Sequence, residues 1–229
     1  WTVLGTNEVK VKISTTGTNC EKTLTLNVSV EDQPNPTIAG PSVVCTGDVA
    51  TYSVTAVSGH SYLWSLGGTN GTFTSGTNAP TATIEWLTAG TETITLVQTN
   101  ATGNCSATTS MLVTINQTPV QTTIAGKETV CNGSVEPYSV TNIAGQSYVW
   151  TVTGGTITSG AGTNAITVQW TAIGAQTVKV NIKTNGTNCE VDLSKNVTVE
   201  FQPAPSIVGD ANVCTESEET YSTTANAGS

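Results

Sequence analysis

The sequence has no arginine, one histidine and one methionine, and its seven lysines face sixteen acidic residues, which gives a net charge of −9. A chain without arginine or a basic run lacks the electrostatic surface that nucleic-acid phosphates require, so we expect no nucleic-acid partner. No apolar stretch approaches the ~18 residues of a membrane-spanning helix, and residues 1–12 show no signal-peptide pattern. We therefore expect no direct insertion into a membrane.

Threonine is abundant instead, at 46 of the 229 residues, together with 22 glycines. Threonine is β-branched, fits the pleat of a strand, and gives a sheet a polar outer face without charge. Apolar and polar residues alternate, as in Val9, Val11 and Ile13 around Lys10 and Lys12. This period of two, with no helical period in any window of twelve residues, predicts an all-β fold.

Two blocks of sequence recur along the chain. The first runs from a Trp to an Asn-Cys pair, without gaps, at residues 1–20, 86–105 and 170–189. The second occupies residues 37–64 and 123–150, and its first half returns at 206–221. The offsets give a period of about 85 residues.

The repeats and the prolines between them divide the chain into four parts. We predict the C-terminal half of a truncated module at 1–33, complete modules at 37–117 and 123–201, and the N-terminal part of another at 206–229. We therefore expect the chain to be a piece of a longer array. Short strands separated by Gly- and Asn-rich turns in ~85 residues predict that each module is a small antiparallel β-sandwich.

The order of motifs within a module resembles the PKD-like, Ig-like repeats of bacterial surface proteins. The matching positions are Ile38, Gly40, Cys45, Tyr52, Tyr62, Trp64, Trp86 and Cys105, and then Ile124, Gly126, Cys131, Tyr138, Tyr148, Trp150, Trp170 and Cys189. The resemblance implies tandem Ig-like β-sandwich modules in an extended array. The chain departs from the better-known PKD motif, because Ser65 and Thr151 follow the tryptophans where that motif has an aspartate. No role of those aspartates transfers to this chain.

The six cysteines fall into two classes by their place in the repeat. The first class is Cys45, Cys131 and Cys214, and the second class is Cys20, Cys105 and Cys189. No CxxC motif occurs and there is one histidine, so the spacings fit no zinc site. We predict structural disulfides formed outside the cytoplasm, with buried free thiols as the alternative.

Two disulfide pairings stay open. Pairing within a module, Cys45 with Cys105 and Cys131 with Cys189, is the simple expectation for classes that recur together. The Ig-like strand order implied by the resemblance, however, puts the two classes at opposite poles of a module, ~23–30 Å apart, whereas a disulfide allows ~6 Å between Cα atoms. The alternative is a bond between modules, Cys45 with Cys189, which predicts a stiff filament.

Residues that would support catalysis or metal binding are few. His60 is in a Gly-His-Ser turn, and the repeat has Gln146 at the same place, so we expect a solvated loop residue. The four aspartates do not cluster as calcium ligands, and the run Glu216, Glu218 and Glu219 is predicted to be a solvated turn. We predict no catalytic residue, no metal site, no cofactor and no enzymatic activity.

The aromatic residues have two interpretations. Tyr62 with Trp64, and Tyr148 with Trp150, lie two apart on one strand and are predicted to point into the core. Trp86 and Trp170 occupy the same position of the repeat, and a tryptophan at this position in every module favours a structural role. The alternative for these two tryptophans is stacking on a sugar ring.

These observations predict a structural and adhesive segment of a long secreted bacterial cell-surface filament, as the resemblance implies for adhesins of gliding bacteria. We expect it outside the cell, at the surface, associated with the outer membrane or secreted. The alternative is a spacer or carbohydrate-binding region of a secreted polysaccharide-active enzyme. Expected partners are other modules of the chain, surface glycans or host and substratum surfaces, and neighbouring chains, because Thr-rich strands with few charges have weakly protected edges.

Overall fold

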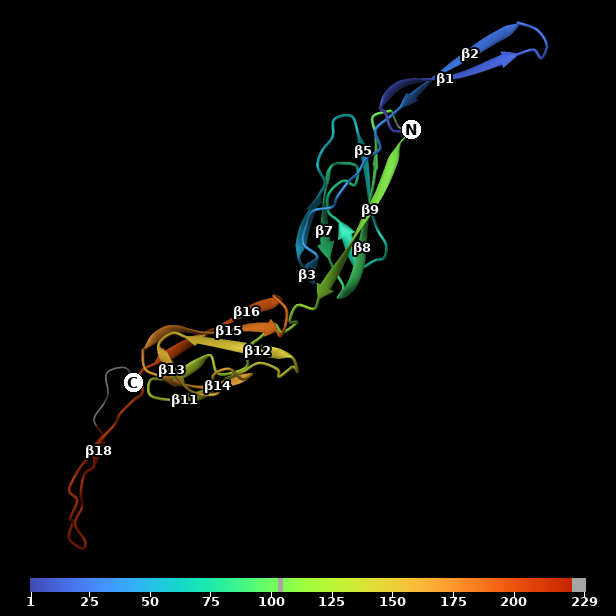
Figure 1. Cartoon of the computed structure of the whole chain (residues 1–229). Helices are drawn as coiled ribbons and strands as arrows, with labels where there is room; N and C mark the ends of the chain where they lie inside the picture. Colours follow the sequence, from blue (N-terminus) through green and yellow to red (C-terminus); the bar gives the residue numbers. More distant parts are fainter. Residues whose placement is uncertain (103–104, 224–229) are drawn as a thin grey trace. The chain divides into compact units, whose positions relative to one another are not determined.

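The computed structural model describes residues 1–102 and 105–223, which divide into two units, Trp1–Gln117 and Thr118–Ser229. All secondary structure in the described residues is β-strand, which confirms the all-β prediction. Figure 1 shows the strands of both units. None of the described segments is a helix long and apolar enough to cross a membrane.

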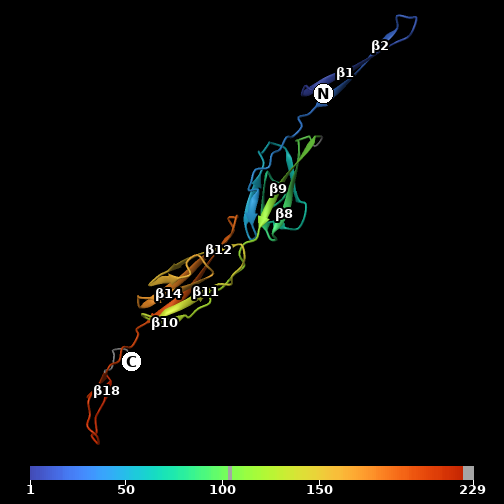
Figure 2. The ribbon, with the colours of Figure 1, turned by 60° about the horizontal axis from the view of Figure 1, so that its bottom comes forward.

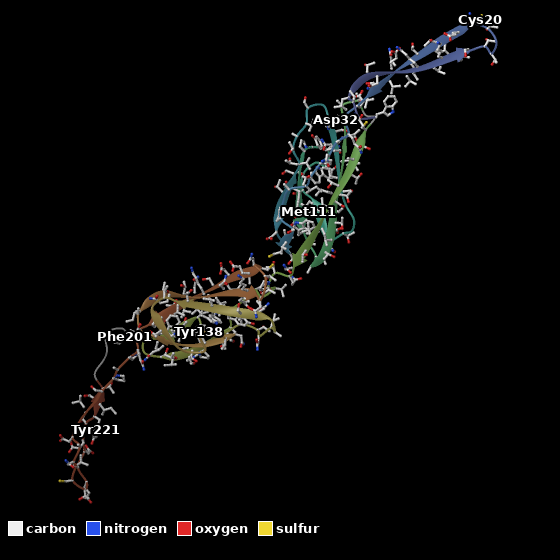
Figure 3. All side chains as sticks on the ribbon, in the orientation of Figure 1. Cys20, Asp32, Met111, Tyr138, Phe201 and Tyr221 are labelled. Atoms are coloured by element: carbon white, nitrogen blue, oxygen red, sulfur yellow. The ribbon has the colours of Figure 1, made fainter. Side chains whose placement is uncertain are left out.

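The first unit begins with a hairpin and continues with a complete module. The hairpin pairs β1 (Gly5–Ser14) with β2 (Glu21–Val30) in antiparallel register, and Figure 3 shows Cys20 at its tip. The strands of the module, called the first module below, are β3 (Val43–Cys45), β4 (Val49–Ser53), β5 (Ser61–Leu66), β6 (Gly71–Phe73), β7 (Thr81–Trp86), β8 (Gly90–Thr99) and β9 (Ser106–Asn116).

Two sheets form the first module. One has the order β3-β9-β8-β5 and the other the order β4-β7-β6. All pairs are antiparallel except β3 with β9, a short parallel pair that brings Cys45 opposite Asn116. Figure 2 shows the long strands β8 and β9 side by side, as their register from Gly90↔Ile115 to Thr99↔Ser106 requires.

The second unit repeats this topology and ends in a short two-stranded segment. The second module consists of β10 (Thr129–Cys131), β11 (Val135–Ser139), β12 (Gln146–Val152), β13 (Gly155–Ser159), β14 (Ala165–Trp170), β15 (Gly174–Thr184) and β16 (Glu190–Glu200). Its sheets have the orders β10-β16-β15-β12 and β11-β14-β13, with β10 and β16 parallel. The pair β17 (Ile207–Val208) and β18 (Ser222–Thr223) follows. The predicted module boundaries stay a prediction.

A recurring aromatic pair occupies the centre of each core. The rings of Tyr52 and Trp86 meet edge to face with centroids 6.1 Å apart, and those of Tyr138 and Trp170 do so at 5.9 Å. Burial of such aromatic side chains is a large part of the hydrophobic stabilisation of a small domain. The two cores are separate clusters, so each module buries its own apolar residues.

The Ile-x-Gly sequence recurs in both modules for a steric reason. Gly40 has a φ of +155°, and a Cβ there would collide with the Tyr52 ring. Gly126 has the same relation to Tyr138, with a φ of +141° and a distance that leaves no space for a Cβ. The tyrosine ring therefore packs against the glycine, and any larger residue would displace the ring from the core.

Candidate functional site

His60, the single imidazole, lies beside an amide. Its Nδ1 is 2.9 Å from Nε2 of Gln98, and both line a depression of about 350 Å³ with Asp32 and the linker residues 33–37. An amide neither activates a nucleophile nor relays a proton as a carboxylate would. The corresponding residue of the second module, Gln146, accepts a hydrogen bond from Gln121 at 2.9 Å. This position therefore makes a polar contact in both modules, with Gln98 of β8 in the first and with Gln121, which precedes β10, in the second.

The acidic residues form no metal centre in the described part of the chain, where no three His, Cys, Asp or Glu side chains converge. Glu216, Glu218 and Glu219 are all exposed, and Glu216 has a φ of 68°. Their prediction as a solvated turn agrees with this exposure.

The paired aromatics of β5 and β12 lie in the cores. The exposed fractions of Tyr62, Trp64, Tyr148 and Trp150 are between 2 % and 7 %. The indole Nε1 of Trp64 donates to the carbonyl of Ala79 at 2.8 Å, and that of Trp150 donates to Thr163 at 2.8 Å. These bonds tie the strand to the loop between β6 and β7 in the first module and between β13 and β14 in the second, so the ring supplies both apolar area and a fixed orientation.

Trp86 and Trp170 are both 0 % exposed. Stacking on a sugar requires an accessible ring face, so the alternative that these tryptophans bind carbohydrate is wrong. The reason is the register of the smaller sheet, in which Trp86 lies opposite Gly71 and Trp170 opposite Gly155. Glycine leaves space for the indole to lie over the neighbouring strand within the core.

A buried carboxylate that the sequence reasoning missed holds a loop of the first module. Glu92 is 4 % exposed and accepts hydrogen bonds from the backbone N–H groups of Gly68 at 2.7 Å, Asn70 at 3.1 Å and Thr93 at 3.0 Å. All these partners belong to the first module, and a carboxylate with three N–H donors is fully satisfied. Its role is therefore structural.

The outer face of the larger sheet in the second module is the candidate binding surface. A depression of about 380 Å³ is lined by Val149, Thr151, Lys179, Asn181, Asp192, Leu193 and Ser194, which we call the lysine face. Asn181 and Asp192 are opposite one another on β15 and β16, and the Asn181 amide donates to the Asp192 carboxylate at 2.9 Å. Polar groups beside an exposed Val149 offer hydrogen bonds and an apolar contact together.

The equivalent face of the first module is chemically different. Leu63, Thr95, Val97 and Thr108 take the places of Val149, Lys179, Asn181 and Asp192. Because Lys179, Asn181 and Asp192 do not recur with the repeat, sequence patterns gave no signal for the lysine face. Only the cross-strand registers bring its residues together.

The six cysteines are in two chemical states. Cys45 and Cys189 are disulfide-bonded, whereas Cys20, Cys105, Cys131 and Cys214 are free thiols. Because Cys105 and Cys131 are free, neither of the bonds expected within a module is present. Formation of a disulfide agrees with the prediction of an oxidising environment.

Comparison with solved structures gives low overall similarity. A SusE-like, surface located polysaccharide binding protein of Bacteroides thetaiotaomicron is 14 % identical over 72 % of this chain and 34 % of its own, with a TM-score of 0.37. Fibronectin(III)-like modules of Clostridium thermocellum CbhA are 14 % identical over 72 % of this chain and 95 % of theirs, with a TM-score of 0.35. The chain spans about a third of the length of the first of these proteins.

Invasin, a bacterial integrin-binding protein, is 13 % identical over 89 % of this chain and 47 % of its own, with a TM-score of 0.31. Comparison with curated protein sequences gives no match. The family of the PKD-like domain matches the sequence twice, at residues 30–113 and 117–199, and the chain therefore belongs to the PKD-like domain family.

Proposed function

We propose that the chain is a structural and adhesive segment of a long secreted bacterial cell-surface protein, a stalk of PKD-like modules of the kind that adhesins of gliding bacteria contain. One observation carries the proposal: each complete module closes a separate core, with equivalent strands and with tyrosine and tryptophan at equivalent positions. A unit that is stable by itself can be repeated to any length, and its function then needs no active site.

The experiment uses antibodies raised against the 229-residue chain. On intact, unpermeabilised cells of the source organism they should label the surface, and their Fab fragments should reduce attachment of those cells to a substratum. Fab fragments against an unrelated surface protein are the control. Labelling that appears only after lysis would contradict the surface location, and undiminished attachment would contradict the adhesive role.

The lysine face supports a second candidate, a carbohydrate-binding or spacer region of a secreted polysaccharide-active enzyme. Its depression of about 380 Å³ presents Lys179, Asn181 and Asp192 to solvent on a rigid sheet. The test is affinity electrophoresis through gels containing single polysaccharides. Retardation of the chain that is lost in Lys179→Thr and Asp192→Thr, which carry the residues of the first module, would support this function.

The matched control is Thr95→Lys, which places a lysine on the equivalent face of the first module. A chain that is retarded equally whether or not the lysine face is intact would bind elsewhere. No retardation in any polysaccharide would remove this second candidate and leave the first untouched.

A further inference from the structure

We infer that the free edge of β12 in the second module pairs with the same edge of a second copy of the chain, in antiparallel orientation, with Trp150 on the two-fold axis. The inference concerns the second module alone and does not depend on the proposed function. It rests on backbone groups that β12 leaves unpaired, on a loop that differs between the modules, and on the distribution of charge around the edges.

The backbone of β12 is unpaired on one side. The strand is the last in the order β10-β16-β15-β12, so no strand of the module lies beyond it. β12 and β5 have equivalent registers with their neighbours, and the N–H of Trp64 in β5 points away from β8. By the two-residue period of a strand, the backbone groups of Tyr148, Trp150 and Val152 point to the free edge. Within the described residues, these N–H and C=O groups make no hydrogen bond.

The first module closes the equivalent edge with its own loop. The N–H of Trp64 donates to the carbonyl of Thr77 at 3.0 Å, so the loop between β6 and β7 occupies the middle of the edge of β5. In the second module Ala161 takes the place of Thr77, and its carbonyl accepts no hydrogen bond from the N–H of Trp150. The edge of β5 is therefore protected, whereas that of β12 can accept another strand.

Glycine explains why the loop of the second module differs. Gly160 and Gly162 have φ values of +79° and +83°, and Asn78 takes the place of Gly162 in the first module. Glycine adopts such left-handed conformations without steric cost, which permits a tight turn. The N–H of Thr163 closes that turn on the carbonyl of Gly160 at 3.0 Å. The loop thus bonds to itself and not to the backbone of β12.

Charge and proline protect the other edges of the second module. The edge strand β11 contains Pro137, and the ion pairs of Lys127 with Glu136 and of Lys195 with Glu128 lie on the side of β10 and β11. The strands β12 and β13 contain neither a proline nor a charged residue. Proline and charge are the usual means by which sheets avoid pairing at their edges. The side of β12 has neither of them.

A second copy of the chain fits this edge as the occupant. Two identical edges related by a two-fold axis pair antiparallel, and both cores then lie on the same side of the joined sheet. With the axis at Trp150, this residue pairs with itself and Tyr148 pairs with Val152 of the second copy, so all the open groups gain partners. The net charge of −9 makes two copies repel one another, and an uncharged edge is where they approach at the lowest electrostatic cost.

The side chains on the outer face agree with this pairing. Val149, which is 62 % exposed, would lie opposite Thr151 of the second copy. Pairs of β-branched residues across antiparallel strands are favourable. The nearest lysines, Lys179 and Lys183, are on β15. Those of the two copies would be three strand spacings apart, ~14 Å, which exceeds the ~8 Å over which charges interact in physiological salt.

Sedimentation velocity of the chain, with its free thiols alkylated to prevent disulfide-linked dimers, tests the pairing. We expect a reversible dimer of the parent chain that dissociates on dilution. The double variant Val149→Lys, Thr151→Lys places like charges opposite one another and should be monomeric at low salt. The matched control is Leu63→Lys, Ser65→Lys on β5, which should leave the dimer unchanged. A parent chain that is monomeric up to its solubility limit, or equal loss of the dimer in both variants, would overturn the inference.

Charge exchange at the same two positions tests the orientation and detects a misfolded variant. Val149→Lys with Thr151→Glu puts lysine opposite glutamate only in the antiparallel pair, so this variant should still dimerise. The double lysine variant mixed with Val149→Glu, Thr151→Glu should form a heterodimer, which a chain that fails to fold could not do. Absence of both dimers would overturn the inference.

Hydrogen exchange of the parent chain locates the interface. Peptides that contain β12 should exchange more slowly as the protein concentration rises, because the N–H groups of Tyr148, Trp150 and Val152 become hydrogen-bonded. Peptides that contain β5 should show no such change. Exchange in β12 that is independent of concentration, or protection that appears instead in the hairpin of β1 and β2, would overturn the inference.

Discussion

The first and second modules share the aromatic residues of their cores but differ in a loop and in one core-facing position. The edge-to-face Tyr–Trp pair, the tyrosine on glycine and the tryptophan opposite glycine occur in both. The comparison teaches that the repeat constrains the residues that fill the sandwich and leaves the polar groups at its ends free to diverge.

The loop that joins the two sheets has different lengths in the two modules. It comprises residues 67–70 between β5 and β6, but only residues 153–154 between β12 and β13. In the longer loop, the backbone N–H groups of Gly68 and Asn70 donate hydrogen bonds to the carboxylate of Glu92. In the second module, the half-buried Gln176 takes the place of Glu92. The buried carboxylate is therefore a consequence of two inserted residues.

One core-facing position is apolar in the first module and charged in the second. Met111 packs against the core of the first module. Lys195, at the same place in β16, bonds with Glu128 at 2.9 Å, and its side chain is 15 % exposed. Ser42 takes the place of Glu128 in the first module. At this core-facing position, the first module therefore has an apolar contact and the second module has an ion pair.

The largest expected effect falls on the common core. Trp86→Ala and Trp170→Ala should each lower the free energy of unfolding of their own module by ~3–5 kcal/mol, because each removes a fully buried indole. Denaturant-dependent hydrogen exchange, followed in peptides of each module, measures the two effects separately. If the losses of unfolding free energy in the two variants differ by more than ~1 kcal/mol, about the contribution of one buried methyl group, the two tryptophans are not equivalent.

A smaller effect should distinguish the loops. Glu92→Gln replaces one acceptor oxygen by an N–H₂ donor facing backbone donors, which should cost the first module ~2–3 kcal/mol. Gln176→Glu is the matched control and should change the second module by no more than ~0.5 kcal/mol. The measurement is urea unfolding at neutral pH, and equal changes in the two variants would refute the assignment of Glu92 to the longer loop.

Alkaline titration should show that the buried tyrosines of the two cores, Tyr52 and Tyr138, both ionise late. Burial raises the pKa of Tyr52 to about 12, and burial likewise raises the pKa of Tyr138. A raised pKa in the folded state means that the stability contributed by the neutral phenol is complete below about pH 10 and is lost as pH rises toward 12. Absorbance at ~295 nm should show late ionisation that Tyr52→Phe partly removes, and full ionisation of every tyrosine by pH 10 would contradict it.

The smallest expected effect concerns the ion pair of Lys195 with Glu128 and how its contribution to stability changes at acidic pH. The hydrogen bond and charge of Lys195 lower the pKa of Glu128, so this pair stabilises the second module above the ordinary glutamate pKa and loses its effect as pH falls below it. Lys195→Met, which copies the first module, should remove this acid dependence without loss at neutral pH. Urea midpoints at several pH values test this, with Glu128→Ser as control, and an acid dependence retained in both variants would contradict it.

Much of the fold follows from the sequence because the repeat aligns equivalent core residues. The period of two predicted strands such as β1, and the recurring Tyr and Trp positions of the complete modules fall on the buried faces. The candidate site could not be predicted in this way. Lys179, Asn181 and Asp192 are neighbours through cross-strand registers, and none of them recurs in the first module.

The sequence by itself determined the all-β class, the repeat and the two classes of cysteine, because each depends on local pattern or on comparison of one module with the next. Tertiary structure alone decided that Trp86 and Trp170 are buried, that Glu92 holds a loop and that no disulfide forms within a module. Burial and register depend on which strand lies beside which, and this is a property of the assembled sandwich that no single strand contains.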